Sequence, residues 1–442
     1  MNIAAKKSDL QNHEMLVKLF ENNILNQKGF IRNFSEESFD ILKKSGLPGR
    51  KDEEYKYFPA FRYFPESPVI PEEYDKSVLP DIKSELFKNP DAIHLVFIDG
   101  ILSKDYSNLN SRDDNLEIHL MDQLSEKELE YFFSEHLNTQ NINHDPFIDL
   151  NSSFLKKGVV LKIKKKSNSL PIYCYHLTSS KDKESLVNFR TILILEDDSK
   201  ASYNELFFSM NNTAGFENHF TEAYVGKGSK LDYYRIQNKK GDEILLNNVN
   251  IHQYENSLAN TYTFSLAGRM LRNNLNIILE DENCESHLYG LYFVKGKDLI
   301  DNHTTVDHKK ANCFSNENYK GILDENGKGV FNGKIYVRPN AQKTNAFQSN
   351  KNIVLTDTAN INTKPQLEIW ADDVKCSHGA TTGQIDKEQL FYLRTRGLDE
   401  KTAKALLLHA FAFEIIDKIE IADIKDYLTK KINKQLGYQF SD

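Results

Sequence analysis

Two groups of cysteine and histidine side chains are the residues of this sequence that could do chemistry. Cys376 and His378 are separated by one residue, and His303, His308 and Cys313 follow one another in five-residue steps. A Cys-x-His pair at the end of an extended strand can present both side chains to one side, and thiolate with imidazole suits iron, zinc and Fe–S clusters. Because a closed metal site takes four ligands, the pair predicts an open site, completed from elsewhere in the fold or from another chain.

A structural interpretation of these residues stays open. Cys376 can equally be a buried cysteine in a β-to-helix turn, with a hydrogen-bonded His378 beside it. The five-residue steps of the second group do not keep side chains on one face of a strand, whose period is two, so we interpret that group as core packing. We expect Cys174 and Cys284 to be small core residues.

Composition and missing motifs exclude several classes of function. The sequence contains no P-loop, GxGxxG, GxSxG, HExxH or EF-hand motif, so we expect neither nucleotide binding nor enzyme activity. The 56 Lys and Arg against 64 Asp and Glu give a net charge of −8, which argues against a nucleic-acid partner. Four cysteines with no CxxC pair fit a reducing, cytoplasmic compartment. The first residues lack an apolar region of signal-peptide length, and the longest apolar stretch, Ala405–Phe413, is too short to span a membrane.

The amino-terminal residues 1–85 are predicted to form a helical segment followed by a proline-rich arm. Apolar residues from Leu16 to Ile24 recur near the 3.6-residue period, and a second helix is expected over Ser35–Gly46. Five of the 11 prolines then lie between Pro59 and Pro80, a composition typical of an extended arm.

Residues 86–370 are predicted to be an all-β unit with no helix inside it. Apolar and polar residues alternate in runs such as Val159–Lys164 and Asn274–Leu279, with polar turns between them such as Gly226–Ser229. Periodicity alone leaves a large sandwich and a parallel β-solenoid both open. The length of the region and its asparagine-bearing strand ends favour the solenoid.

Residues 371–442 are predicted to be a helical domain. Asp386 and Asp399 are expected N-caps of two successive helices, and Gly397 is expected to end the first in a left-handed conformation. The second helix carries an apolar stripe through Leu407 and Phe411, and further apolar residues leave it little polar face. Such a helix must be covered on more than one side, by its own β domain or by a partner.

The stretch Thr363–Gly397 resembles the hallmark of the SufD branch of the SufB/SufD family, core components of the SUF system of iron–sulfur cluster assembly. The resemblance extends through HTTVDH (His303–His308), Tyr319–Ile335, Thr344–Leu355 and the amino-terminal GRKDEEYKYF. SufB-like chains carry HEAT where this chain has His378-Gly379-Ala380-Thr381, and a functional cysteine where it has Gln348-Ser349-Asn350. Both differences indicate the SufD branch and imply that the chain does not assemble clusters alone.

The resemblance implies a right-handed parallel β-helix flanked by helical segments. It also implies pairing with a SufB-type paralogue through the β-helices and binding of a SufC-type ABC ATPase through the carboxy-terminal helices, with a homodimer as the alternative in isolation. His378 is expected to face the SufB-type chain and help hold iron or an Fe–S cluster transiently in the complex, with Cys376 behind it, and no cofactor is expected to be held stably by this chain alone. The expected docking residues for the ATPase are Leu407, Phe411, Phe413 and Ile415.

Two other functions remain as alternatives. One is a β-solenoid protein-interaction module without metal dependence. The other is a carbohydrate-active β-helix enzyme, which would need clustered Asp, Arg or Lys on one face and usually a secretion signal.

Overall fold

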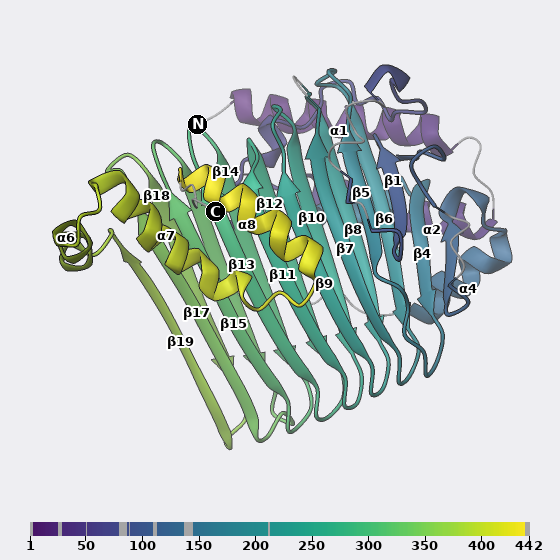
Figure 1. Ribbon diagram of the computed structural model, residues 1–442. Coiled ribbons are helices and arrows are strands. Elements are labelled where there is room, and N and C mark those ends of the chain that lie inside the picture. Colours follow the sequence, from purple (N-terminus) through teal and green to yellow (C-terminus); the bar gives the residue numbers. More distant parts are fainter. Residues whose placement is uncertain are drawn as a thin grey trace.

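The computed structural model describes residues 3–24, 29–49, 51–78, 86–87, 89–108, 113–136, 145–210 and 213–437. Within these residues two β-sheets stack face to face as a flattened parallel solenoid (Figure 1). The ten-stranded sheet has the order β19 (Val374–Gly383), β17 (Thr344–Val354), β15 (Phe314–Leu323), β13 (Glu285–Val294), β11 (Leu258–Ala267), β9 (Lys230–Asn238), β7 (Lys200–Ser209), β5 (Ile172–Thr178), β1 (Ile93–Ile98) and β2 (Ile101–Leu102). The nine-stranded sheet has the order β18 (Asn360–Ile369), β16 (Lys328–Val337), β14 (Leu299–His308), β12 (Met270–Leu279), β10 (Ile244–Gln253), β8 (Phe216–Val225), β6 (Leu186–Leu195), β4 (Lys157–Ile163) and β3 (Leu116–Leu120).

Successive strands of the solenoid alternate between the two sheets. Each strand from β4 onward pairs in parallel with the strand two places along the chain, as β12 pairs with β14 from Met270↔Leu299 onward. The turns between strands use positive φ angles at Asn256, Asn283 and Asn312, which asparagine tolerates better than most residues. The prediction of a parallel β-helix is confirmed, and the sandwich alternative is wrong.

The main hydrophobic core lies between the two sheets. Alternate residues of each strand point into it, including Val249, Leu275 and Val306 from the nine-stranded sheet and Leu231 and Leu288 from the other. Strands such as β8, β10 and β12 are buried at every position, because other parts of the chain also cover their outer faces, as α5 covers β8 and Tyr55 covers Arg272 of β12. The alternating apolar residues of the sequence are the ones that point into the interior of the solenoid.

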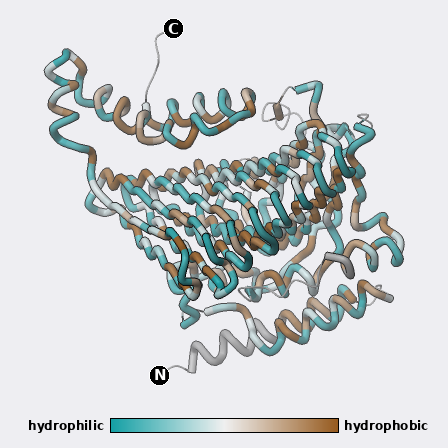
Figure 2. Tube along the Cα trace, turned by 90° about the horizontal axis from the view of Figure 1, so that it is seen from below, coloured by the Kyte–Doolittle hydropathy of each residue, from teal (hydrophilic) through white to brown (hydrophobic). Residues whose placement is uncertain are grey.

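Helices cover both outer faces of the solenoid, as Figure 2 shows. The nine-stranded sheet carries helices α1 (Ile3–Ile24), α2 (Gly29–Ser45), α4 (Glu126–His136) and α5 (Pro146–Ser153). The ten-stranded sheet carries α7 (Glu400–Ile416) and α8 (Ala422–Leu436), preceded by α6 (Lys387–Thr395). Short 3₁₀ turns lie at Glu53–Tyr55, Ala60–Arg62, Lys76–Val78 and Met121–Gln123. Among the described residues, no helix is long and apolar enough to cross a membrane.

Two element predictions are corrected. Helices α4 and α5 interrupt the region predicted to be wholly β; both are short, and their start signals are local, a Ser125–Glu128 capping box and the Asp145 N-cap. The solenoid also continues beyond the boundary predicted at residue 370. Residues Val374–Gly383 extend the backbone ladder of β17, so the helical region begins at Lys387. The amino-terminal boundary at 85, with Pro80 and Arg50, lies outside the described residues.

Candidate functional site

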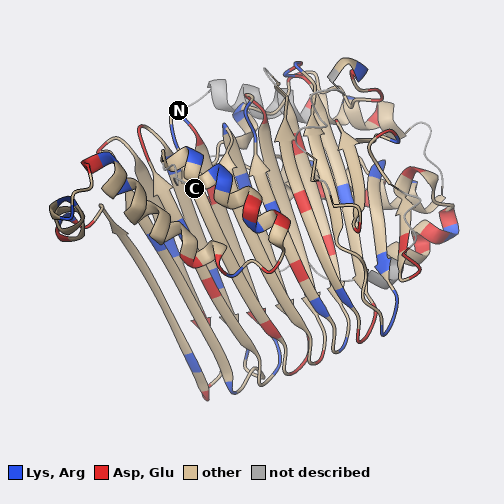
Figure 3. Cartoon of the chain, in the orientation of Figure 1, with Lys and Arg blue, Asp and Glu red and all other residues tan. Residues whose placement is uncertain are grey.

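The last coil of the solenoid is uncovered, and we call the strands β18 and β19 its open end. Strand β19 pairs with β17 on one edge, and no described strand pairs with its other edge. Every residue from Ser377 to Gly383 is exposed. A Cβ atom added at Gly379 or Gly383 would meet no atom within 4 Å. Figure 3 shows this outermost strand almost free of charge, and its one charged residue is Lys375.

Both residues of the predicted Cys-x-His pair lie on β19. Cys376 pairs in register with Ala346, and His378 pairs with Gln348. Ala346 and Gln348 are buried inside the solenoid, and register partners of a parallel sheet point to the same side. Cys376 and His378 therefore line the interior face of the solenoid where that interior reaches solvent, and the structure brings the pair together on one face.

The environments of the two side chains differ. Cys376 is half-buried against the main core, and burial raises the pKa of its thiol, an effect only partly offset by a backbone hydrogen bond at Ala346. An activated cysteine needs the opposite shift, so Cys376 is not built as a thiolate nucleophile. His378 is exposed at the rim. Among the described residues, no three His, Cys, Asp or Glu side chains are grouped so that they could hold a metal ion.

The second sequence group is not brought together. His308 is fully buried, its Nε2 lies 2.9 Å from Ser315 Oγ, and burial lowers the pKa of its imidazole to about 3. Cys313 is buried with its Sγ donating to the Asp281 carbonyl at 3.2 Å. His303 points instead to the outer face of the nine-stranded sheet, where Nε2 lies 2.9 Å from Asp301 Oδ1. The core-packing interpretation is confirmed for His308 and Cys313.

The amino-terminal motif has a role that sequence reasoning missed. Glu54 accepts from His303 Nδ1 at 3.1 Å and pairs with Lys334 Nζ at 2.5 Å. These partners hold the pKa of Glu54 well below its usual range, against the opposing effect of burial. Nearby, Tyr55 Oη donates to Asp145 Oδ2 at 2.7 Å, and the Arg272 guanidinium stacks on the Tyr55 ring. These contacts, which we call the clasp, fix the segment that leads into the amino-terminal arm to the outer face of the nine-stranded sheet.

The predicted docking residues of α7 divide into two sets. Ile415 is 0% exposed and packs in the core between α7 and the ten-stranded sheet, so its assignment to a partner surface is wrong. The buried face runs through Leu408, Ala412 and Ile415, because this face meets β13 and β15. Leu407 and Phe411 instead line a groove of about 420 Å³ beside the ends of β17 and β19. Phe413 is half-buried and stacks on His409.

Helix α6 presents two aromatic residues that the sequence analysis did not single out. Phe391 is 69% exposed and Tyr392 56% exposed, and no residue of α6 is buried. The helix projects beyond the open end in Figure 1. Asp386 caps it, accepting from the backbone N–H groups of Glu388 and Gln389, as predicted. Adjacent exposed aromatic residues on a capped helix are typical of a protein-binding surface.

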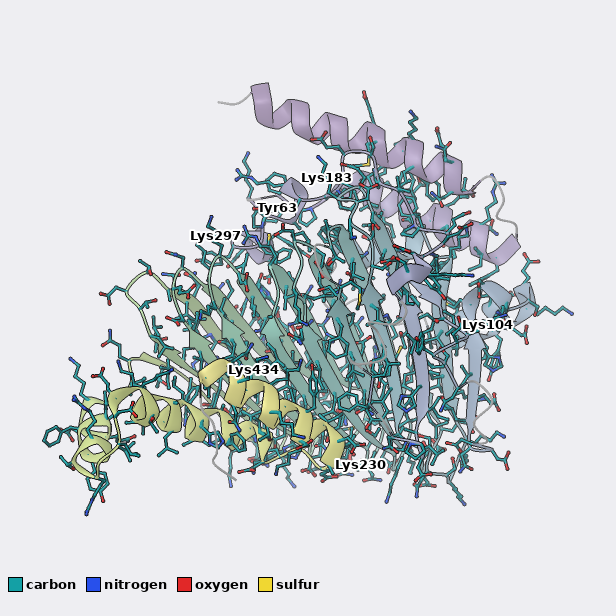
Figure 4. The ribbon with its side chains drawn as sticks, turned by 45° about the horizontal axis from the view of Figure 1, so that its top comes forward. Tyr63, Lys104, Lys183, Lys230, Lys297 and Lys434 are labelled. Carbon is teal, nitrogen blue, oxygen red and sulfur yellow. The ribbon has the colours of Figure 1, made fainter. Side chains whose placement is uncertain are left out.

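The carboxy-terminal helices are fixed to the solenoid by ion pairs as well as by apolar packing. Lys230, at the start of β9, pairs with Glu420 in the connection between α7 and α8 at 3.2 Å, and Figure 4 shows Lys230 beside these helices. Lys320 Nζ of β15 donates to the Phe411 carbonyl at 3.0 Å and lies 4.4 Å from the centre of the Phe411 ring. The groove wall that contains Phe411 is therefore anchored to a strand of the last coils.

Comparison with known proteins gives a consistent family. Residues 176–411, just over half of the chain, match the family described as SUF system FeS cluster assembly, SufBD core domain. The chain is 29% identical over 413 residues to an iron–sulfur cluster assembly SufBD family protein of Synechocystis, covering 91% of this chain and 90% of that protein. It is 28% identical over 410 residues to the iron–sulfur cluster assembly protein SufD of Escherichia coli, covering 91% and 92%. The chloroplastic protein ABCI7 of Arabidopsis thaliana is 26% identical, covering 90% and 84%. On this match and on the β-solenoid that carries it, the chain belongs to the SufBD family of SUF-system iron–sulfur cluster assembly proteins, as a SufD-like member.

Proposed function

We propose that this chain is a non-catalytic scaffold subunit of a cytoplasmic SUF assembly complex. Its open end pairs with a SufB-type paralogue, and its carboxy-terminal helices bind a SufC-type ABC ATPase. The observation that carries the proposal is the uncovered strand β19, which presents His378 at its rim in a chain of the SufBD family. The four free cysteines, none in a disulfide, are consistent with a reducing compartment.

Unsatisfied backbone groups favour a β partner at the open end. An edge strand offers a row of N–H and C=O groups, and proteins generally cover or blunt such an edge to prevent unwanted pairing. Here β19 is ten residues long and exposed along most of its length. A second solenoid of the same repeat could continue both sheets without a break, because its end strands would have the same spacing.

Apolar side chains at the same end add surface for a specific partner. Trp370 is 48% exposed, and Ile369 and Phe347 are also exposed. Trp370 stacks on Tyr336, with the Arg338 guanidinium 5.3 Å from the Trp370 ring centre. Buried tryptophan and arginine residues supply much of the binding free energy of protein interfaces. The Trp370, Tyr336 and Arg338 side chains are suited to anchor the contact.

Iron or a nascent Fe–S cluster is the cargo of the proposed interface. His378 supplies one imidazole ligand, and thiolates of the SufB-type chain complete the set, since two side chains of this chain cannot close a site. Cys376 lies two residues away on the same face and is half-buried. Its role is to support the strand beneath His378, and His378 is the ligand that this chain supplies.

The ATPase surface consists of α6 together with the groove beside α7. Phe391 and Tyr392 are the exposed anchors, and Leu407 and Phe411 form the groove. Helix α7 contacts β13 and β15, and the groove also includes Thr381 and Thr382 of β19. A partner bound there touches the strand that carries His378, so nucleotide-driven movement of the ATPase would reach the cargo site directly.

Co-expression with a SufB-type and a SufC-type protein tests the assembly. The variant Gly379→Arg places a long side chain in open space, which the fold tolerates but a paired solenoid does not. Gly49→Arg is the matched control, because an added Cβ at the half-buried Gly49 would make only an ordinary contact, 3.8 Å from Asp52 Oδ2, and Gly49 lies in the amino-terminal segment rather than on β18 or β19. We expect wild type and Gly49→Arg to retain both partners and Gly379→Arg to lose the SufB-type chain while keeping the ATPase. Normal retention of the SufB-type chain by Gly379→Arg would place the contact elsewhere.

A further inference from the structure

Three inward-facing side chains on successive strands lead from the rim into the solenoid. Glu317 of β15 pairs in register with Gln348 of β17, and Gln348 pairs with His378 of β19. Neighbouring strands lie about 4.8 Å apart, so side chains at one register position stack directly above one another. We call these three stacked side chains the column. It ends at the buried Glu317 carboxyl on one side and at the exposed His378 imidazole on the other.

Glu317 is a buried carboxyl without a cationic partner. It is 1% exposed, and no described Lys, Arg or His forms an ion pair with it. Burial raises the pKa of Glu317 to about 7, although the hydrogen bond from Gln348 offsets part of this effect. An isolated carboxyl in an apolar interior destabilises a fold, and a hydrophobic residue would be the more stable choice at a position with no function.

Gln348 is oriented by the groups around it. Its Nε2 donates to Glu317 Oε2 at 2.8 Å. On the opposite sheet stands Gly333, where an added Cβ would lie only 2.3 Å from Gln348 Nε2, so the absence of a side chain makes room for the amide. The other end of the amide, Oε1, is buried and has no hydrogen-bond partner. A buried acceptor without a partner is uncommon in native proteins and requires an explanation.

We propose that Gln348 Oε1 accepts a hydrogen bond from one ring nitrogen of His378, so that Glu317 and Gln348 position the imidazole and fix its tautomer. When Glu317 is ionised it can only accept, so the donor end of the amide is committed to Glu317 and only the acceptor end is left for His378. The second ring nitrogen of His378 is then unprotonated and faces the open end as a ligand. Outer groups of this kind orient the ligating histidines of metal sites. The purpose of this arrangement rests on the proposed cargo role of His378, whereas the hydrogen bond between Gln348 and His378 does not depend on that role.

Nitrogen NMR of the full-length chain, labelled at histidine, tests the geometry. At a pH where imidazole is neutral, a fixed tautomer gives one protonated and one unprotonated ring-nitrogen signal, and exchanging tautomers give averaged signals. His378→Gln assigns the signals. We expect fixed signals for wild type and averaged signals for Gln348→Met, which removes the acceptor while keeping a similar volume. Glu317→Gln should also give averaged signals, because a neutral amide at position 317 can accept from or donate to Gln348 and no longer imposes one orientation.

Asn350→Leu is the matched control. Asn350 lies on the same strand, is equally buried and donates to Tyr292 Oη and the Tyr319 carbonyl, but its register partner on β19 is Ala380. The Asn350→Leu variant should leave the His378 ring-nitrogen signals fixed. Fixed signals in a folded Gln348→Met variant would overturn the positioning role. A buried water that satisfies Gln348 Oε1 in the wild type would explain such a result. Averaged signals in Asn350→Leu would do the same, because the effect would then be general to the interior.

Cluster content of the co-purified complex separates this inference from the proposed function. We expect Gln348→Met to lower iron and sulfide several-fold with the three chains still bound together. If His378→Ala lowers them and Gln348→Met does not, the imidazole holds cargo without the column, and only the inference fails. If neither variant lowers them, the proposed cargo role fails as well, whatever the NMR signals show.

Discussion

Glu54 Oε2 and His303 Nδ1 lie 3.1 Å apart although 249 residues separate them in the chain. The contact joins the amino-terminal arm to strand β14, and Lys334 and Asn332 complete the polar surround of the same carboxylate. The stretches that carried the family resemblance, GRKDEEYKYF and HTTVDH, therefore meet in space. Part of that resemblance reflects a clasp between the arm and the solenoid rather than the cargo site.

Glu54→Gln tests the clasp through its pH dependence. Because the folded state lowers the pKa of Glu54, the carboxylate stabilises the fold at pH values above the unfolded pKa of about 4.3 and loses this effect as the pH falls further. We expect the variant to be less stable than wild type by about 1 kcal/mol at neutral pH, a discounted value because the side chain is partly exposed. Urea unfolding at several pH values measures this difference. A constant difference down to acid pH would contradict the ionic role of Glu54.

His308 predicts a second pH effect of the same sign from a different cause. Burial lowers the pKa of its imidazole to about 3, so the folded state keeps it neutral while the unfolded chain takes up a proton near pH 6.5. Its neutral form therefore stabilises the fold fully above that pH, and the effect declines as the pH falls towards 3. We expect His308→Gln to be less stable than wild type near pH 7 but to lose less stability between pH 7 and 4, by on the order of 1–3 kcal/mol. Parallel pH profiles of the two proteins would show that His308 does not titrate on unfolding.

The two sets of apolar residues in the carboxy-terminal helices predict different phenotypes. Ile415→Asp puts a carboxylate into the core beneath α7 and should unfold the helices, seen as lost helical circular dichroism. Phe391→Glu changes an exposed side chain and should leave the spectrum intact while releasing the ATPase. Tyr63→Glu is the control, since Tyr63 is an exposed aromatic residue of the amino-terminal arm. ATPase binding by a folded Phe391→Glu variant would remove α6 from the docking surface.

The sequence predicted the solenoid and the carboxy-terminal caps because those signals are local. Alternation along a strand, asparagine in turns, and aspartate before a helix each act within a few residues, and Asp386, Gly397 and Asp399 lie where expected. Helices α4 and α5 were missed because each is short and amphipathic only in part. The β region was predicted to end at residue 370, whereas β19 adds Val374–Gly383 to it, because ladder pairing with β17 outweighs the two glycines of this stretch.

The candidate site was only half visible in the sequence. Cys376 and His378 were found as a pair because they lie two residues apart in the chain, which places them on the same face of β19. Glu317 and Gln348 belong to the same column, but their relation depends on the register of three strands far apart in sequence, which no local pattern encodes. Ile415 was misassigned because a helix that is apolar nearly all round does not show which face its own sheet will cover.

Cys376→Ala should have a milder effect than loss of the imidazole. Burial raises the pKa of the Cys376 thiol, so the side chain is mostly a small packing group, and its loss should cost the fold about 1 kcal/mol. We expect the three-component complex to form and to retain most of its iron and sulfide. A complete loss of cluster in Cys376→Ala, with the complex intact, would make the thiol a ligand in its own right.

Iron and acid-labile sulfide measured in the purified three-component complex carrying His378→Ala test directly whether His378 holds the cargo. His378 is exposed and supplies no buried apolar volume, so the variant should fold and assemble normally. We expect the intact complex to hold several-fold less iron and sulfide than wild type, because one ligand of a shared site is missing. Full cluster content in a correctly assembled His378→Ala complex would contradict the cargo role of His378, since the open end would then bind a partner without using the imidazole as a ligand.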